Sequence, residues 1–189
     1  MSRSLAALLA GSQVVLMAPA PVRGAQAYLH ESEAARSIFP NATASARKEL
    51  LLTDAELGAL EKAIGKRVDV RSYPYLEVRS GDGTTGFVFI LDVIGQSQPI
   101  TFAVGVSAEG ILQDVQVMVY REPRGEEIQD RRFRRQFAGK RTRDPIALGR
   151  DIDAISGATI SSRSATFAAR KGLAICELLR ARAPARKGP

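Results

Sequence analysis

The chain has 189 residues, which is long enough to bury a hydrophobic core and fold as one domain with a short appendage. Apolar residues make up 45% of the chain and charged residues 25%, a balance typical of a globular protein. The formal net charge is +7, but tryptophan is absent and no nucleic-acid-binding motif is found, so we expect no nucleic acid partner. A single cysteine and a single histidine exclude an internal disulfide and a Cys/His metal cluster.

The first residues have the pattern of a secretory leader. Arg3 is followed by an apolar run from Leu5 to Met17, and the stretch ends in Ala25-Gln26-Ala27. This order of charge, apolar run and A-x-A predicts a signal peptide over residues 1–27 and a periplasmic or otherwise extracytoplasmic protein. The run is shorter than the about 20 apolar residues of a transmembrane helix, and an uncleaved leader that anchors the protein is the alternative.

Residues 28–66 are predicted to be an N-terminal helical segment. A first helix is expected over residues 31–39, because Pro40 stops it. A capping box at residues 53–56 predicts a second helix that ends at Gly65. Both helices are expected to pack against one side of the following domain. His30 lies in a polar segment and is expected to be an ordinary surface residue.

Residues 67–183 are predicted to form the main domain, which begins with strands. Four apolar stretches separated by short turns are expected to be strands, at residues 75–78, 86–93, 100–106 and 111–120. The short loops favour antiparallel pairing, because parallel neighbours need a crossover of about a dozen residues. Val115, Val117 and Val119 alternate with polar residues, so one face of the last strand should be buried.

The stretch at residues 128–137 is predicted to be a helix. Phe133 and Phe137 are four residues apart and are expected to dock on the core together. The densest positive patch of the chain surrounds them: Arg131, Arg132, Arg134 and Arg135. One interpretation is a solvated helix face, and the other is a docking surface for an acidic redox partner or anionic lipid headgroups.

Residues 153–162 read D-A-I-S-G-A-T-I-S-S and lead into a long helix predicted at residues 160–181. Ser156 and Gly157 are typical of a turn, and the start of a helix gathers N–H groups that have no intrahelical acceptor. Such a helix start attracts phosphate because the helix dipole adds positive charge there. From spacing alone, the residues favour a simple turn followed by a helix cap.

Three hydroxyl groups are expected at the rim of this helix start. Ala158 leaves room at the side, and the hydroxyls come from Thr159, Ser161 and Ser162. One face of the helix carries small and apolar residues, which would let the helix pack close to the sheet. Cys176 lies on that face and is expected to be a core thiol. Residues 184–189 are expected to be a disordered tail.

The pattern D-x-x-S-G-A-T-x-S resembles the flavinylation motif of the FMN-binding domain family, and the matching residues are Asp153, Ser156, Gly157, Ala158, Thr159 and Ser161. This family includes the covalent-flavin subunits of Na+-pumping NADH:quinone oxidoreductases and of Rnf complexes. In it, the threonine carries FMN through a phosphoester bond, which a dedicated flavin transferase installs by taking FMN from FAD. The resemblance implies covalent FMN on Thr159, with Ser161 and Ser162 near the phosphate.

The resemblance extends more loosely upstream to about Val68, through the order of the strands. The segment Tyr120-Arg121-Glu122-Pro123-Arg124-Gly125 resembles a family loop that commonly reads H-x-E-T-P-G and lies against the flavin. It keeps Glu122, Pro123 and Gly125 but lacks the histidine and the threonine, so Glu122 is the flavin contact that it implies. The alternative is a strand-exit turn with solvated charges. Asp153 is implied to be part of what the transferase recognises, or is a turn residue that caps its own backbone.

The predicted architecture is α+β: a mostly antiparallel sheet packed by helices, with a long C-terminal helix that opens at the flavin site. The first functional hypothesis is an extracytoplasmic carrier of covalent FMN that transfers electrons between a membrane-associated redox partner and an acceptor. The second is a module that binds FMN non-covalently, or a regulatory module. The third is an enzyme in which FMN reduces a small substrate. No nucleophile–base pair or metal site is found, which favours electron transfer over a stand-alone enzyme.

Overall fold

The computed structural model describes residues 25–182, so most of the expected leader and the expected tail lie outside the described residues. Its centre is a six-stranded sheet with the order β1-β6-β5-β4-β3-β2, in which every neighbouring pair is antiparallel. The strands are β1 (Gln26–Ala27), β2 (Ala44–Leu51), β3 (Ser72–Ser80), β4 (Gly83–Ile94), β5 (Pro99–Ser107) and β6 (Leu112–Tyr120). The predicted α+β class is confirmed.

The described residues also form helices, and the second of them starts and ends at clear local signals. They are α1 (Glu31–Ile38), α2 (Asp54–Ile64), the 3-10 helix η1 (Glu126–Gln129), α3 (Arg131–Arg134) and α4 (Thr159–Arg182). In α2, Glu56 N–H donates to Thr53 Oγ1 at 3.3 Å, and Thr53 N–H donates to Glu56 Oε2 at 2.8 Å. Gly65 ends this helix with a φ of 69°. The predicted capping box and helix end are therefore confirmed.

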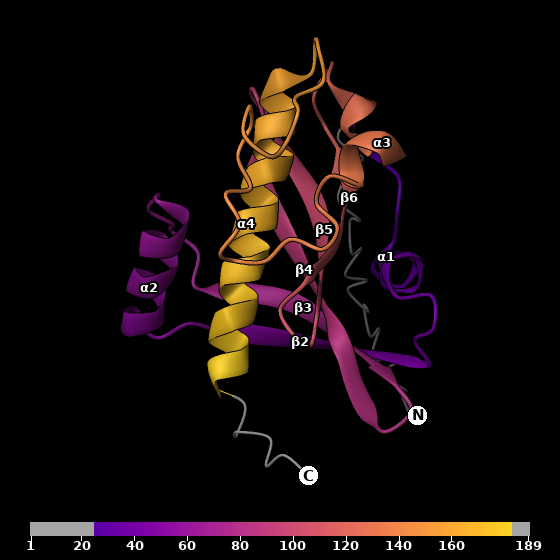
Figure 1. The fold of residues 1–189 in the computed structure, drawn as a ribbon, viewed down its shortest axis with the longest axis vertical. Helices are drawn as coiled ribbons and strands as arrows, with labels where there is room; N and C mark the ends of the chain where they lie inside the picture. The colour runs from indigo at the N-terminus through magenta and orange to yellow at the C-terminus, as the bar shows by residue number, and fades with distance from the viewer. Residues whose placement is uncertain (1–24, 183–189) are drawn as a thin grey trace, which may run out of the picture.

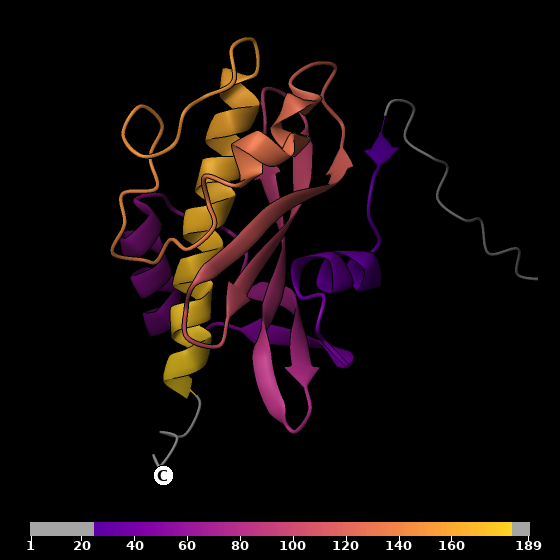
Figure 2. The ribbon, with the colours of Figure 1, turned by 45° about the vertical axis from the view of Figure 1, so that its right-hand side comes forward.

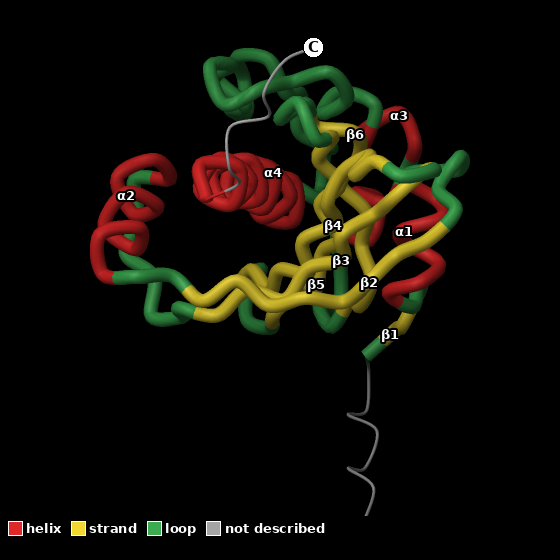
Figure 3. The backbone as a smooth tube through the Cα atoms, turned by 90° about the horizontal axis from the view of Figure 1, so that it is seen from below, coloured by secondary structure: helices red, strands yellow, loops and turns green. Residues whose placement is uncertain are grey.

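The first two helices lie on opposite faces of the sheet, which corrects the expectation that both pack on one side (Figure 1). Helix α2 places Leu60 and Ile64 in a core that it shares with α4. Helix α1 places Ala34 and Ile38 in a second core on the other face. Figure 3 shows the curved sheet between the α2–α4 pair and α1. The sequence between the two helices crosses from one face to the other, as strand β2.

Strand β2 was not predicted, so residues 28–66 are not wholly helical. All but one of its residues are exposed, because β2 is an edge strand that pairs with β3 alone. It therefore lacks the alternation that reveals a half-buried strand. The predicted strand at residues 75–78 is the centre of the longer β3. At the other edge, Gln26 and Ala27, the last residues of the expected leader, pair with Tyr120 and Val119 of β6.

Helix α4 packs closely on the sheet. A Cβ atom added at Gly172 would lie 2.5 Å from Val104 Cγ1 of β5, so this approach requires glycine. Ala165, Ala168 and Ala169 lie on the same buried face. The small face that the sequence predicts for this helix is therefore confirmed. Its N-terminal end is held at a fixed position relative to the sheet.

The helix predicted at residues 128–137 is shorter and broken. Asp130 has an extended ψ of 131°, which separates η1 from α3, and its carboxylate accepts a hydrogen bond from Arg132 N–H at 2.6 Å. Phe133 and Phe137 dock on the core as predicted, with ring centroids 5.4 Å apart. Of the basic patch, Arg134 pairs with Asp114, while Arg131, Arg132 and Arg135 are exposed.

A long connection, residues 139–158, leads from the α3 region back to the start of α4 and runs beside that helix (Figure 2). The carboxylate of Asp151 organises it, accepting from Ile146 N–H at 3.1 Å, from Ala147 N–H at 2.8 Å and from Lys140 Nζ at 2.8 Å. Within residues 25–182, none of the helices combines the length and the apolar character needed to cross a bilayer.

Candidate functional site

The segment that precedes α4 forms a turn closed by the side chain of Ser162. Gly157 has a φ of 81°, and a Cβ added there would meet nothing within 4 Å. Ala158 N–H donates to Ile155 O at 3.0 Å. Ser162 Oγ accepts from Ile155 N–H at 3.2 Å and donates to Ala158 O at 2.9 Å. The turn is therefore held against the first turn of the helix.

Thr159 is the first residue of α4, and its side chain is exposed. Ser162 N–H donates to Ala158 O at 2.8 Å and is the first N–H of the helix to have a backbone acceptor. The N–H groups that precede it lack an intrahelical acceptor and carry the positive end of the helix dipole. Ser156 and Gly157 are exposed beside them. The structure thus brings an exposed threonine hydroxyl to a helix start suited to phosphate.

Ser161 and Ser162 do not share an exposed rim with Thr159. Their exposed fractions are 4% and 0%, and both hydroxyls have hydrogen-bond partners inside the protein. Successive residues of a helix are about 100° apart around its axis, so the second and third residues after Thr159 turn towards the sheet. The expectation of three hydroxyls at one rim is therefore wrong. The two serines position the helix start instead.

The hydroxyl of Tyr120 joins the end of β6 to the first turn of α4. Its oxygen lies 2.5 Å from Arg124 O and 2.8 Å from Ser161 Oγ. A carbonyl only accepts, so the single tyrosine proton goes to Arg124 O and Ser161 donates to Tyr120. Burial raises the pKa of Tyr120, against the lowering effect of the bond from Ser161, so the phenol stays protonated at neutral pH. Gly125 fits here because an added Cβ would lie 2.3 Å from Ser161 Oγ.

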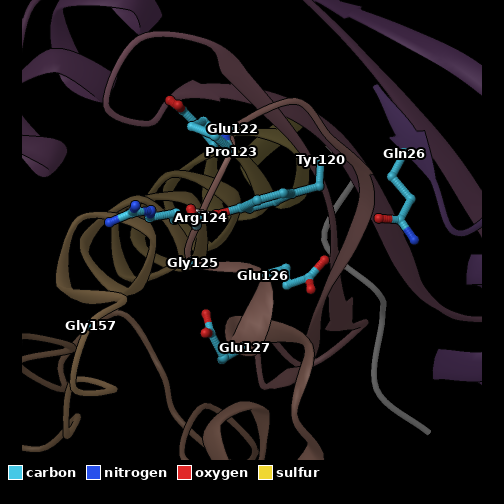
Figure 4. A pocket seen from close by; sticks show the side chains of 9 residues that line it. All are labelled: Gln26, Tyr120, Glu122, Pro123, Arg124, Gly125, Glu126, Glu127 and Gly157. Atoms are coloured by element: carbon cyan, nitrogen blue, oxygen red, sulfur yellow. Dashed lines mark hydrogen bonds between the residues drawn. The ribbon is translucent and has the colours of Figure 1, made fainter. Parts of the chain in front are cut away.

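A pocket of about 580 Å³ opens between this junction and the turn before α4 (Figure 4). Its size falls within the usual range for cofactor sites, about 300–1,000 Å³. The structure therefore brings the loop after β6 and the turn at Gly157 to one cavity, although they are more than thirty residues apart in the sequence. The lining residues are Gln26, Tyr120, Glu122, Pro123, Arg124, Gly125, Glu126, Glu127 and Gly157.

Glu122 lines this pocket, but its carboxylate is committed to the β4–β5 hairpin. Oε1 accepts from Ser97 N–H at 2.6 Å and from Gln98 N–H at 2.8 Å, and Oε2 lies 3.2 Å from Ser97 Oγ. Burial acts to raise the pKa of Glu122, but the hydrogen bonds from Gln98 and Ser97 outweigh it and lower the pKa. The structure thus gives this side chain a role in holding the hairpin beside the pocket. Its contact with a flavin stays a prediction.

Asp153 lies at the entry to the motif, where the side-chain amide of Gln136 holds its backbone. Asp153 N–H donates to Gln136 Oε1 at 2.7 Å, and Gln136 Nε2 donates to Asp153 O at 3.2 Å. The Asp153 carboxylate is exposed and lines a second cavity of about 510 Å³ between the motif and α3. An exposed carboxylate is accessible to another protein, as recognition by a transferase requires.

Three residues that sequence reasoning did not identify as site residues prove central to this arrangement. Tyr120 and Gln136 hold the two loops by hydrogen bonds to partners far away in the sequence, and Arg124 lines the pocket. The sequence gives no sign of the roles of Tyr120 and Gln136, because their hydrogen-bond partners are known only from the tertiary structure. Arg124 could have been identified, because it lies inside the loop that resembles the family motif.

The local chemistry suits a phosphate group and a flat aromatic ring. The helix start offers N–H donors to a phosphate, and Ile94 and Ile160, exposed by 62% and 43%, offer apolar surface nearby. Ser164 Oγ donates to Ile94 O at 3.0 Å, which places the end of β4 beside the first turn of α4. Within residues 25–182, no group of three or more His, Cys, Asp or Glu side chains is arranged to hold a metal ion. The residues present therefore fit a phosphate-bearing flavin such as FMN.

Comparison with known proteins gives one family. The model of the FMN-binding domain matches residues 95–174, a stretch that contains β5, β6, the pocket-lining loop, the turn at Gly157 and most of α4. The stretch begins later than Val68, the expected upstream limit. No curated protein matches the chain. The match supports FMN as the cofactor and a flavin-binding role. Over residues 95–174, the chain therefore matches the FMN-binding domain family.

Proposed function

We propose that this protein is an extracytoplasmic electron carrier in which the Thr159 hydroxyl holds FMN through a phosphoester bond. The observation that carries the proposal is the position of Thr159, exposed at the first residue of α4 within the matched domain. A flavin transferase would join Thr159 Oγ1 to the FMN phosphorus of FAD. The P–O bond of the FAD pyrophosphate breaks, AMP leaves, and the threonine proton is released.

The surrounding residues support this attachment. The linked phosphate keeps one negative charge, which the free N–H groups at the start of α4 would stabilise. Ser161 and Ser162 are buried and hold the turn, so they orient Thr159 and do not compete with it for the flavin. When bound, FMN accepts and donates electrons singly or in pairs, and the protein supplies position and electrostatic environment.

We infer that a membrane-associated redox partner donates electrons to the flavin or accepts electrons from it. Ile94 and Ile160 give an exposed apolar surface next to Thr159, and Arg131, Arg132 and Arg135 are exposed on the neighbouring α3 region. Apolar contact with charged residues around it is the usual composition of a transient protein interface. The leader expected at residues 1–27 supports an extracytoplasmic location, which fractionation of cells that express the full chain would test.

The test of attachment is the mass and visible absorbance of the protein, co-expressed with a flavin transferase and then denatured and desalted. We expect a mass increase equal to FMN less one water on the peptide that contains Thr159. Thr159→Val keeps the shape of the side chain and should abolish the increase. Thr142→Val, at an exposed threonine in the connection before the motif, is the matched control and should retain it.

Two results would overturn the covalent assignment. One is flavin that survives denaturation of Thr159→Val. The other is a wild-type chain without added mass when the same transferase flavinylates a second target in the same cells. Flavin that is present in the native protein but lost on denaturation would indicate a non-covalent FMN module. Rapid oxidation of the reduced holoprotein by a small molecule would indicate a reductase.

A further inference from the structure

The pocket between the loop after β6 and Gly157 has an unequal set of charges. Its charged lining residues are three glutamates and one arginine: Glu122, Glu126, Glu127 and Arg124. Glu122 is bonded to the β4–β5 hairpin, and Glu126 Oε2 accepts from Tyr28 Oη at 3.1 Å. A phosphate that enters this pocket therefore meets carboxylates, and one cation among the lining residues is available to offset them.

Arg124 has a fixed backbone and an uncommitted side chain. Its carbonyl oxygen accepts from Tyr120 Oη at 2.5 Å, and Gly125 follows with a φ of 96°, so the chain direction at this point is set. Its side chain is exposed and makes no hydrogen bond or ion pair within residues 25–182. In Figure 4 the guanidinium extends away from Glu126 and Glu127. By contrast, the guanidinium of Arg121 is bonded to Pro99 O and Thr101 Oγ1.

We propose that Arg124 is the residue that recognises the flavin phosphate, pairing with the oxygens of a phosphate held at Thr159. The inference rests on the proposed function. It extends that function to Arg124, an arginine that the family loop pattern H-x-E-T-P-G does not contain. A guanidinium suits the task because its planar donors bind two phosphate oxygens at once. The N–H groups at the start of α4 approach the phosphate from the helix side, and Arg124 approaches it from the loop after β6.

A second cation must be distinguished from Arg124. Arg163 is exposed and lies four residues after Thr159, one turn further along the same helix face. It does not line the pocket. Arg163→Gln and Arg124→Gln remove the same charge, one outside the pocket lining and one within it, so the pair forms a matched comparison.

The experiment uses the chain expressed without a flavin transferase and compares FMN with riboflavin, which lacks the phosphate. Quenching of flavin fluorescence gives the two dissociation constants, and their ratio measures recognition of the phosphate. We expect the wild type to prefer FMN and Arg124→Gln to reduce that preference about two- to fivefold, as for an exposed ion pair. Riboflavin binding should not change. The preference should weaken with added NaCl in the wild type and less so in Arg124→Gln.

Each other outcome overturns the proposal. If Arg124→Gln weakens FMN and riboflavin binding equally, the Arg124 guanidinium contacts the flavin ring and not the phosphate. If only Arg163→Gln reduces the preference for FMN, Arg163 is the residue that binds the phosphate. A wild type that binds neither flavin, or that shows no preference for FMN, would mean that the pocket does not recognise the phosphate. The mass of transferase-treated protein is measured separately, so failure of covalent attachment is visible independently of Arg124.

Discussion

Tyr120→Phe should destabilise the protein, because it removes one hydroxyl that joins two loops of the site. The change leaves the ring in place and deletes the oxygen that lies 2.5 Å from Arg124 O and 2.8 Å from Ser161 Oγ. Ser161 is 4% exposed, so its hydroxyl would lose its partner in a buried position. A buried polar group without a partner costs about 1–3 kcal/mol.

The free energy of unfolding should therefore fall by about 2 kcal/mol, a large part of the roughly 5–15 kcal/mol typical of a domain. For a chain of this length, that corresponds to a fall in melting temperature of about 4–8 °C. Urea unfolding of the wild type, Tyr120→Phe, Ser161→Ala and the double variant gives the coupling between the two hydroxyls. We expect a coupling energy of about 0.5–1.5 kcal/mol.

Tyr75→Phe is the matched control. Tyr75 is also buried, with an exposed fraction of 6%, but its hydroxyl makes no hydrogen bond within residues 25–182. Its removal should change the free energy of unfolding by less than about 0.5 kcal/mol. If Tyr120→Phe is no more destabilising than Tyr75→Phe, or if the losses from Tyr120→Phe and Ser161→Ala add without coupling, the junction does not hold the site.

Two further predictions concern single side chains. Glu122→Gln should cost about 1.5–3 kcal/mol at neutral pH, because N–H groups of the β4–β5 hairpin donate to a carboxylate. Its folded pKa is lowered by those bonds, so the stabilisation is complete above the unfolded pKa of about 4.3 and is lost as the pH falls through the folded pKa. Urea unfolding of wild type and variant should thus converge in acid, and a difference that persists there would contradict the argument. Cys176 should not react with a thiol reagent until the protein unfolds, because burial raises its pKa to about 12. Labelling of the native protein at the rate of the urea-unfolded chain would show that this thiol is accessible.

The sequence by itself determined the elements whose signals are local. The capping box at Thr53 and the turn glycine at Gly65 each act over a few residues, so they can be read without knowing the fold. The alternation predicted for β6 is wrong, because both faces of that strand are covered and Val119 packs with the core on the α1 face, opposite Val115 and Val117. The motif around Thr159 is equally local, because a turn and a helix start are adjacent in the chain. For this reason the long helix, the antiparallel sheet and the family could all be predicted.

Tertiary structure decided which face each element covers and which loops meet. Strand β2 leaves nearly all its residues exposed, so only its pairing with β3 reveals it, and that pairing carries the chain from α1 on one face to α2 on the other. Tyr120 and Ser161 are 41 residues apart, and their contact turns a strand-exit loop into a wall of the pocket that Gly157 also lines. Glu122 is bonded to a hairpin about 25 residues earlier. Such contacts depend on burial against a partner surface, which exists only once the sheet and α4 have packed together.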